Sequence, residues 1–130
     1  MLLVDTSVWV DFLDGTPTGQ TRHLVKALEE ETPVFYTGIL LQEVLQGFQS
    51  VKQRQTILSS FQKLFLLEPT LEDHIQAARI FTTCRGSGLT VRKSVDCFVA
   101  ALAMRFGLDL LDNDKDYGFI AQCFPLSRVG

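Results

Sequence analysis

The feature that most constrains this chain is the alternation of short apolar runs with longer segments of helical period. Four runs, at residues 2–4, 34–36, 64–67 and 108–111, have strand length and little internal polarity, as is typical of buried parallel strands. Strand followed by helix, repeated, requires right-handed crossovers and a sheet that is covered on both faces. The sequence therefore predicts an α/β protein with three layers and a central, mostly parallel sheet.

Segments of helix length lie between and after these runs. We expect helices at residues 7–13, 20–31, 38–49, 51–63, 71–84, 94–106 and 115–122. Thr70 is the expected N-cap of one helix, because acidic residues follow it in the first turn. Ser94 is the expected N-cap of another, an amphipathic helix whose apolar stripe runs from Val95 to Phe106.

Composition narrows the class of protein. A length of 130 residues with 46% hydrophobic content fits a single domain over residues 1–130. Twelve basic against fifteen acidic residues give a net charge of −3, which excludes a broad basic face that binds nucleic acid by charge alone. The three cysteines form no CxxC pair, so we expect a reducing cytoplasm and neither disulfides nor a cysteine zinc site. The N-terminal residues lack the pattern of a signal peptide, and no apolar stretch approaches the roughly 20 residues that span a bilayer.

Acidic residues follow two of the predicted strands. Asp5 comes directly after the first apolar run, and Asp112, Asp114 and Asp116 come after the fourth. The carboxyl ends of parallel strands lie along one edge of a sheet, where ligands bind, so the two groups are expected to meet. Taken singly, Asp5 is equally explained as a helix N-cap and Asp114 as a turn or cap residue.

Two more acids lie within predicted helices. Glu43 borders an apolar stripe, so its carboxylate must be paired, neutralised or bound to a metal, unless it swings past Gly47 into water. Asp96 lies near a helix start with Ala100 and Ala103 one and two turns on. It either stabilises the helix dipole or lets a ligand approach closely over these small neighbours.

A cluster of such acids repels itself and needs a cation at neutral pH. Hard oxygen ligands without histidine or thiolate favour Mg²⁺ or Mn²⁺ over zinc. An ion of this kind activates water and neutralises a phosphodiester, with one or two ions per site. The sequence therefore predicts a magnesium or manganese site, and the acidic net charge is no objection because the ion supplies positive charge.

Four motifs stand in order along nearly the whole chain: residues 4–13, Glu43 with Gly47, residues 94–103 and residues 110–117. Together they resemble PIN-domain ribonucleases, most of all the VapC toxins of bacterial type II toxin–antitoxin pairs. The resemblance implies a PIN-like α/β/α domain with four to five strands. The sequence departs from the family at Asp112, where Thr or Ser is common, and at Tyr117, where Phe is usual.

The resemblance also implies a set of functional residues. The acidic quartet falls on Asp5, Glu43, Asp96 and Asp114, and Asp116 is a further candidate ligand in an outer position. These residues would hold Mg²⁺ or Mn²⁺ for endonucleolytic cleavage of structured RNA such as a tRNA. In this scheme Asp5, Asp96 and Glu43 hold the main ion, and Asp114 anchors it through water or holds a second.

Supporting roles and partners follow from the same resemblance. The hydroxyl of Thr6 or Ser7 would orient Asp5 or a water molecule. Arg92, Lys93 and Lys115 lie within a few residues of the acids and are candidate contacts for RNA phosphates, with solvated loop charge as the alternative. The family implies a homodimer and a VapB-like antitoxin, one of whose arginines would meet the carboxylates.

Other functions compete with this interpretation. An EF-hand at Asp112 is excluded, because Tyr117 and Cys123 stand where such a loop needs glycine and glutamate. His23 and His74 are interpreted as structural or surface residues. A PIN-like scaffold that has lost catalysis and binds RNA or protein stays open, as does a housekeeping nuclease for RNA or DNA with the same site.

Overall fold

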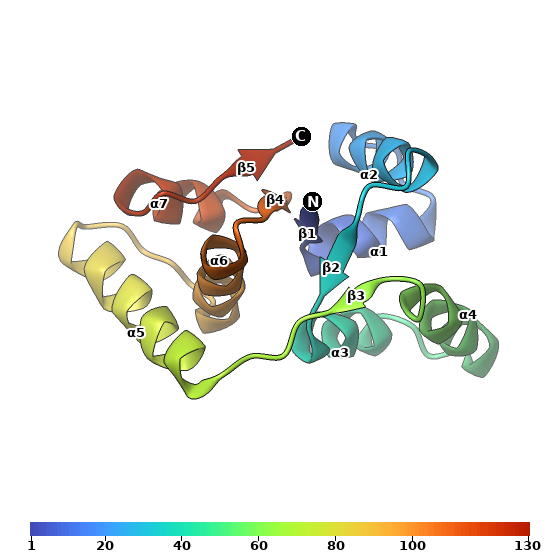
Figure 1. The fold of residues 1–130 in the computed structure, drawn as a ribbon, viewed down its shortest axis with the longest axis horizontal. Coiled ribbons are helices and arrows are strands. Elements are labelled where there is room, and N and C mark those ends of the chain that lie inside the picture. Colours follow the sequence, from blue (N-terminus) through green and yellow to red (C-terminus); the bar gives the residue numbers. More distant parts are fainter.

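The computed structural model describes residues 1–130 and contains one sheet of five strands in the order β3-β2-β1-β4-β5 (Figure 1). The strands are β1 (Leu2–Val4), β2 (Val34–Tyr36), β3 (Phe65–Leu66), β4 (Asp109–Leu111) and β5 (Arg128–Val129). Every strand pair is parallel, which confirms the predicted parallel sheet. The run at residues 64–67 was expected to be buried, but both residues of β3 are exposed because it lies at the edge of the sheet. The strand β5 coincides with no apolar run, because it has only two residues and one of them is charged.

Seven helices connect and cover the strands. They are α1 (Thr6–Asp14), α2 (Gly19–Glu29), α3 (Gly38–Gln46), α4 (Val51–Phe61), α5 (Leu71–Gly86), α6 (Ser94–Phe106) and α7 (Lys115–Cys123). In Figure 1, helices α5, α6 and α7 gather on one side of the molecule and α1 to α4 on the other. No helix is both long enough and apolar enough to cross a membrane.

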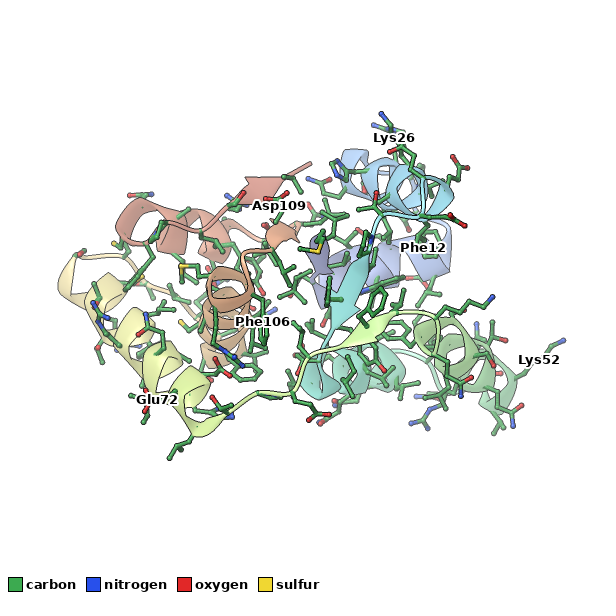
Figure 2. The ribbon with its side chains drawn as sticks, in the orientation of Figure 1. Phe12, Lys26, Lys52, Glu72, Phe106 and Asp109 are labelled. Atoms are coloured by element: carbon green, nitrogen blue, oxygen red, sulfur yellow. The ribbon has the colours of Figure 1, made fainter.

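The alternation of side chains along β1 separates two apolar cores. Leu3 packs into the cluster that includes the buried residues of α5, α6 and α7, whereas Leu2 and Val4 join the cluster formed with α1, α2 and α4. Successive strand residues point to opposite faces of a sheet, so the three-layer α/β/α arrangement follows from this central strand. Exposed charged residues such as Lys26, Lys52 and Glu72 lie on the outer faces of the helices (Figure 2).

Local signals at the helix ends were correct at one position and wrong at another. Thr70 is the N-cap of α5, and its backbone N–H donates to the Asp73 carboxylate at 2.7 Å in a capping box. Ser94 is not a cap: it is already the first residue of α6, and the N-cap is Lys93, which makes no side-chain capping hydrogen bond. Phe106 ends the predicted apolar stripe but is 37% exposed, with the Arg105 guanidinium 4.0 Å from its ring centroid.

A partly buried ion pair joins α5 to α6. Arg105 donates to both oxygens of the Asp73 carboxylate, at 2.6 and 2.8 Å. The Asp73 side chain is 3% exposed and that of Arg105 is 40% exposed. This pair has no contact with the acidic residues at the sheet edge.

Candidate metal centre

The carboxyl ends of β1 and β4 bring two of the predicted acids to one edge of the sheet. The two strands pair directly, with Val4 opposite Leu111, so the residues that follow them are neighbours. Asp5 is the N-cap of α1 and accepts a hydrogen bond from the backbone N–H of Ser7. Asp114 is likewise the N-cap of α7. The capping interpretation of both acids is therefore correct, and it is the capping geometry that holds them at the edge.

Three carboxylates form the tightest group at this edge. Asp96, Asp114 and Asp116 each offer an oxygen, and these oxygens all lie within 4.8 Å of one another. Asp96 is 4% exposed and Asp116 is fully buried. One oxygen of each, Oδ2 of Asp96 and Oδ1 of Asp116, has no hydrogen-bond partner. Burying a carboxylate oxygen that accepts no hydrogen bond costs free energy. A cation bound by these three carboxylates would offset that cost, so the group has the features of a cation site.

The electrostatics of Asp96 point the same way. Burial raises the pKa of the Asp96 carboxyl to about 7, and the negative charges of Asp5 and Asp114 contribute to the increase. The positive charge of Lys93 and the nearby Tyr117 hydroxyl oppose it. The cluster therefore retains a proton near neutral pH unless a cation replaces it.

Asp5 is fixed by hydroxyl groups on either side. Its Oδ2 accepts from Ser7 Oγ at 2.9 Å, and its Oδ1 accepts from the Tyr117 hydroxyl at 2.7 Å. Burial, followed by the charges of Asp5 and Asp96, raises the pKa of the Tyr117 phenol well above its usual range. The hydroxyl of Tyr117 therefore stays protonated and donates. Of the two hydroxyl residues considered for orienting Asp5, Ser7 contacts it and Thr6 contacts Glu43.

Glu43 lies on the Asp5 side of the edge. It is half-buried on α3, and its Oε1 accepts from Thr6 Oγ1 at 2.9 Å. Because Thr6 directly follows Asp5, this bond anchors Glu43 beside β1 and replaces the alternative in which the side chain swings past Gly47 into water. Asp5 and Glu43 are not members of the tight group of three acids.

The basic residues near the acids differ in what they contact. Lys93 Nζ lies 3.8 Å from Asp114 Oδ2. The Arg92 backbone N–H donates to Asp116 Oδ2 at 3.1 Å, and its Nε lies 3.8 Å from Oδ1. Both basic side chains are more than 60% exposed, so these ion pairs are weak and solvated. Lys115 is exposed and forms no ion pair.

The comparisons with known proteins identify the fold family. The PIN-domain model matches residues 2–122. This chain belongs to the PIN-domain family. It is 30% identical to the ribonuclease VapC11 of Mycobacterium tuberculosis, in an alignment covering 99% of this chain and 98% of that protein.

Solved structures agree with this fold. The VapBC2 complex of Rickettsia felis bound to a promoter DNA fragment has a chain that matches with a TM-score of 0.76 and 16% identity, covering 98% of this chain and 96% of that one. The toxin VapC20 of Mycobacterium tuberculosis, which cleaves the sarcin-ricin loop, matches with a TM-score of 0.67 and 16% identity over 95% of this chain and 96% of its own. At these identities the likeness supports the PIN fold alone.

In this PIN domain, the extra acid at position 112 forms an ion pair with Arg128 that the sequence did not predict. Asp112 is 4% exposed and accepts from Arg128 Nε and Nη2 at 2.9 and 2.7 Å. It therefore does not point to solvent, and it lies outside the group formed by Asp96, Asp114 and Asp116. Arg128 was missed because its partner is sixteen residues away in the chain and no local pattern links them.

Proposed function

We propose that this PIN-domain protein is a Mg²⁺- or Mn²⁺-dependent endoribonuclease of the VapC type, which hydrolyses phosphodiester bonds in structured RNA such as a tRNA. The observation that carries the proposal is the pair of buried oxygens on Asp96 and Asp116 that accept no hydrogen bond, grouped with Asp114. The names of its relatives support the substrate class, since VapC11 is a ribonuclease and VapC20 cleaves the sarcin-ricin loop.

The residues fit a hard divalent cation. All the candidate ligands are carboxylates, namely Asp5, Glu43, Asp96, Asp114 and Asp116, and oxygen-only sets favour Mg²⁺ or Mn²⁺. A bound ion of this kind would supply positive charge for the phosphodiester. It would also lower the pKa of a bound water molecule, so that the water becomes a better nucleophile at neutral pH. The high pKa of Asp96 fits a ligand that gives up its proton when a cation binds.

The rest of the site positions these ligands and receives the RNA. Ser7 and Tyr117 hold both oxygens of Asp5, and Thr6 holds Glu43. Orientation of ligands by such hydrogen bonds is a general property of metal sites. We assign Arg92, Lys93 and Lys115 to RNA phosphates on either side of the acids, because they supply local positive charge in a chain of net charge −3.

The same proposal includes two protein partners. We propose that the protein forms a homodimer in the cytoplasm and is inhibited by a small VapB-like antitoxin, as the VapBC complexes among the structural neighbours suggest. Apolar side chains exposed at Leu66, Leu71 and Ile75 give such partners a surface to bury. Leu66 also lines a largely apolar cavity of about 820 Å³ between β3, α5 and α6.

An RNA cleavage assay tests the proposal. Wild-type protein should cut structured RNA with Mg²⁺ or Mn²⁺, stop in EDTA and recover when either ion is restored. Asp96→Asn should keep the fold and lose cleavage, whereas Glu72→Gln, which neutralises an exposed acid on α5, should cleave normally. Cleavage by Asp96→Asn, or cleavage that depends on zinc, would contradict the proposal. Binding of Mn²⁺ without cleavage of any RNA would favour the inactive scaffold.

A further inference from the structure

We propose that Arg128, acting through Asp112, is a positioning residue that holds Asp114 in place for metal binding. The inference rests on the proposed function, because it assumes that Asp114 is a metal ligand. It assigns a task to the strand β5 and to the acid at position 112, neither of which the proposed reaction uses directly.

A continuous chain of hydrogen bonds connects the strand to the ligand. Arg128 grips both oxygens of Asp112 through Nε and Nη2, at 2.9 and 2.7 Å. Asp112 Oδ1 in turn accepts from the Asp114 backbone N–H at 3.2 Å. Arg128 Nη2 also lies 3.4 Å from the Asp114 carbonyl oxygen. The Asp112 carboxylate thus holds the Asp114 backbone N–H, and the Arg128 guanidinium holds the Asp114 carbonyl oxygen.

The helix that follows Asp114 is shaped to receive the guanidinium. A Cβ atom at Gly118 of α7 would lie 3.0 Å from Arg128 Nη1, which is closer than ordinary contact. The absence of a side chain there leaves room for Arg128 against α7. Because β5 pairs with β4, with Arg128 beside Leu110, the arginine approaches from a fixed strand and not from a loose loop.

The pair also has an electrostatic consequence that makes the inference testable. Asp112 is close enough for its charge to contribute to the high pKa of Tyr117, so it belongs to the field of the acidic cluster. If Arg128 acted only by its positive charge, removing it would strengthen cation binding at the nearby carboxylates. If Arg128 positions Asp114, removing it must weaken binding. The two roles predict effects of opposite sign.

The chain contains a matched control for this experiment. Arg105 and Asp73 form a second two-pronged ion pair, with a carboxylate 3% exposed and an arginine 40% exposed. The corresponding values for Asp112 and Arg128 are 1% and 36%. Arg105→Gln and Arg128→Gln therefore break pairs of similar exposure, and only the second pair contacts a proposed ligand.

The test is isothermal titration of Mn²⁺ into the purified proteins, with thermal unfolding of each variant in EDTA. Arg128→Gln should raise the Kd for Mn²⁺ by about tenfold or more, the range typical of residues that orient metal ligands. Arg105→Gln should leave the Kd unchanged at a similar loss of thermal stability. Arg128→Lys keeps the positive charge but cannot donate to both oxygens of Asp112 as the guanidinium does. Its Kd for Mn²⁺ should fall between those of wild type and Arg128→Gln, so this variant provides the test if the glutamine variant does not fold.

A double variant supplies a rescue. Asp112→Thr combined with Arg128→Gln removes the unpaired buried carboxylate and offers a hydroxyl to the Asp114 N–H. The Kd of this double variant for Mn²⁺ should return to within about threefold of the wild-type value, which is less than the roughly tenfold increase expected for Arg128→Gln alone. Equal or tighter binding by the single Arg128 variants would overturn the inference, as would an equal loss in Arg105→Gln. If the wild-type protein binds no Mn²⁺, the proposed function is refuted. If the wild-type protein binds Mn²⁺ and the Arg128 variants bind it equally well, only the role of Arg128 is refuted.

Discussion

The raised pKa of Asp96 makes the stability of the metal-free protein depend on pH. The pKa of this carboxyl is about 7 in the folded protein, against 3.8 for an unperturbed aspartate. The folded state therefore holds the proton more tightly, and the stabilisation is complete below pH 3.8 and lost as pH rises to about 7. Three powers of ten in proton affinity correspond to about 4 kcal/mol. That is a large share of the roughly 5–15 kcal/mol that stabilises a small domain.

Urea unfolding in EDTA between pH 4 and pH 8 measures this effect. Other acids titrate in the same interval, so the informative quantity is the difference between wild type and Asp96→Asn. The asparagine variant cannot ionise, and it should become the more stable protein as pH rises from 4 to 8. Mn²⁺ at about 100 times its Kd should restore about 2.7 kcal/mol to wild type at pH 8 and much less to the variant. Parallel pH profiles for the two proteins, with Glu72→Gln following wild type, would refute the reasoning.

Three further substitutions test single contacts. Tyr117→Phe removes the 2.7 Å hydrogen bond to Asp5 and should lower the free energy of unfolding by about 1–3 kcal/mol; an unchanged urea midpoint would contradict this. Thr6→Val removes the donor to Glu43 at nearly constant volume and should weaken Mn²⁺ binding by about tenfold; an unaltered titration would contradict the role of Thr6 in positioning Glu43. Lys115→Ala should weaken RNA binding modestly and reduce its salt dependence by about one phosphate contact, and no change at low salt would leave Lys115 as solvated loop charge.

The strand and helix pattern could be predicted from sequence because both faces of the central strands are covered, although the edge strand β3 is exposed. The central strands β1 and β2 are apolar runs, and β4 departs from one only at Asp109. Such runs are visible without any tertiary information. The strand β5 could not be predicted this way, since it consists of Arg128 and Val129. Its charged residue is used to pair with Asp112, a contact that exists only in the folded chain.

In the candidate site, too, local features could be predicted from sequence and contacts between distant residues could not. Asp5 and Asp114 could be placed because each follows a strand and caps a helix, which are local properties. The contact of Tyr117 with Asp5 spans 112 positions in the chain, and the only sequence signal was a hydroxyl where phenylalanine is usual. Ser94 was wrongly placed as a cap because its local pattern is compatible with either position. The structure makes it the first helical residue.

The central claim is that distant acids are folded into one pocket that binds a divalent cation. The most direct measurement is anomalous diffraction from crystals grown with Mn²⁺. We expect a manganese peak among the carboxylates of Asp96, Asp114 and Asp116, the group whose oxygens lie within 4.8 Å of one another. A structure with the three carboxylates ordered at saturating Mn²⁺ and no peak between them would contradict the claim.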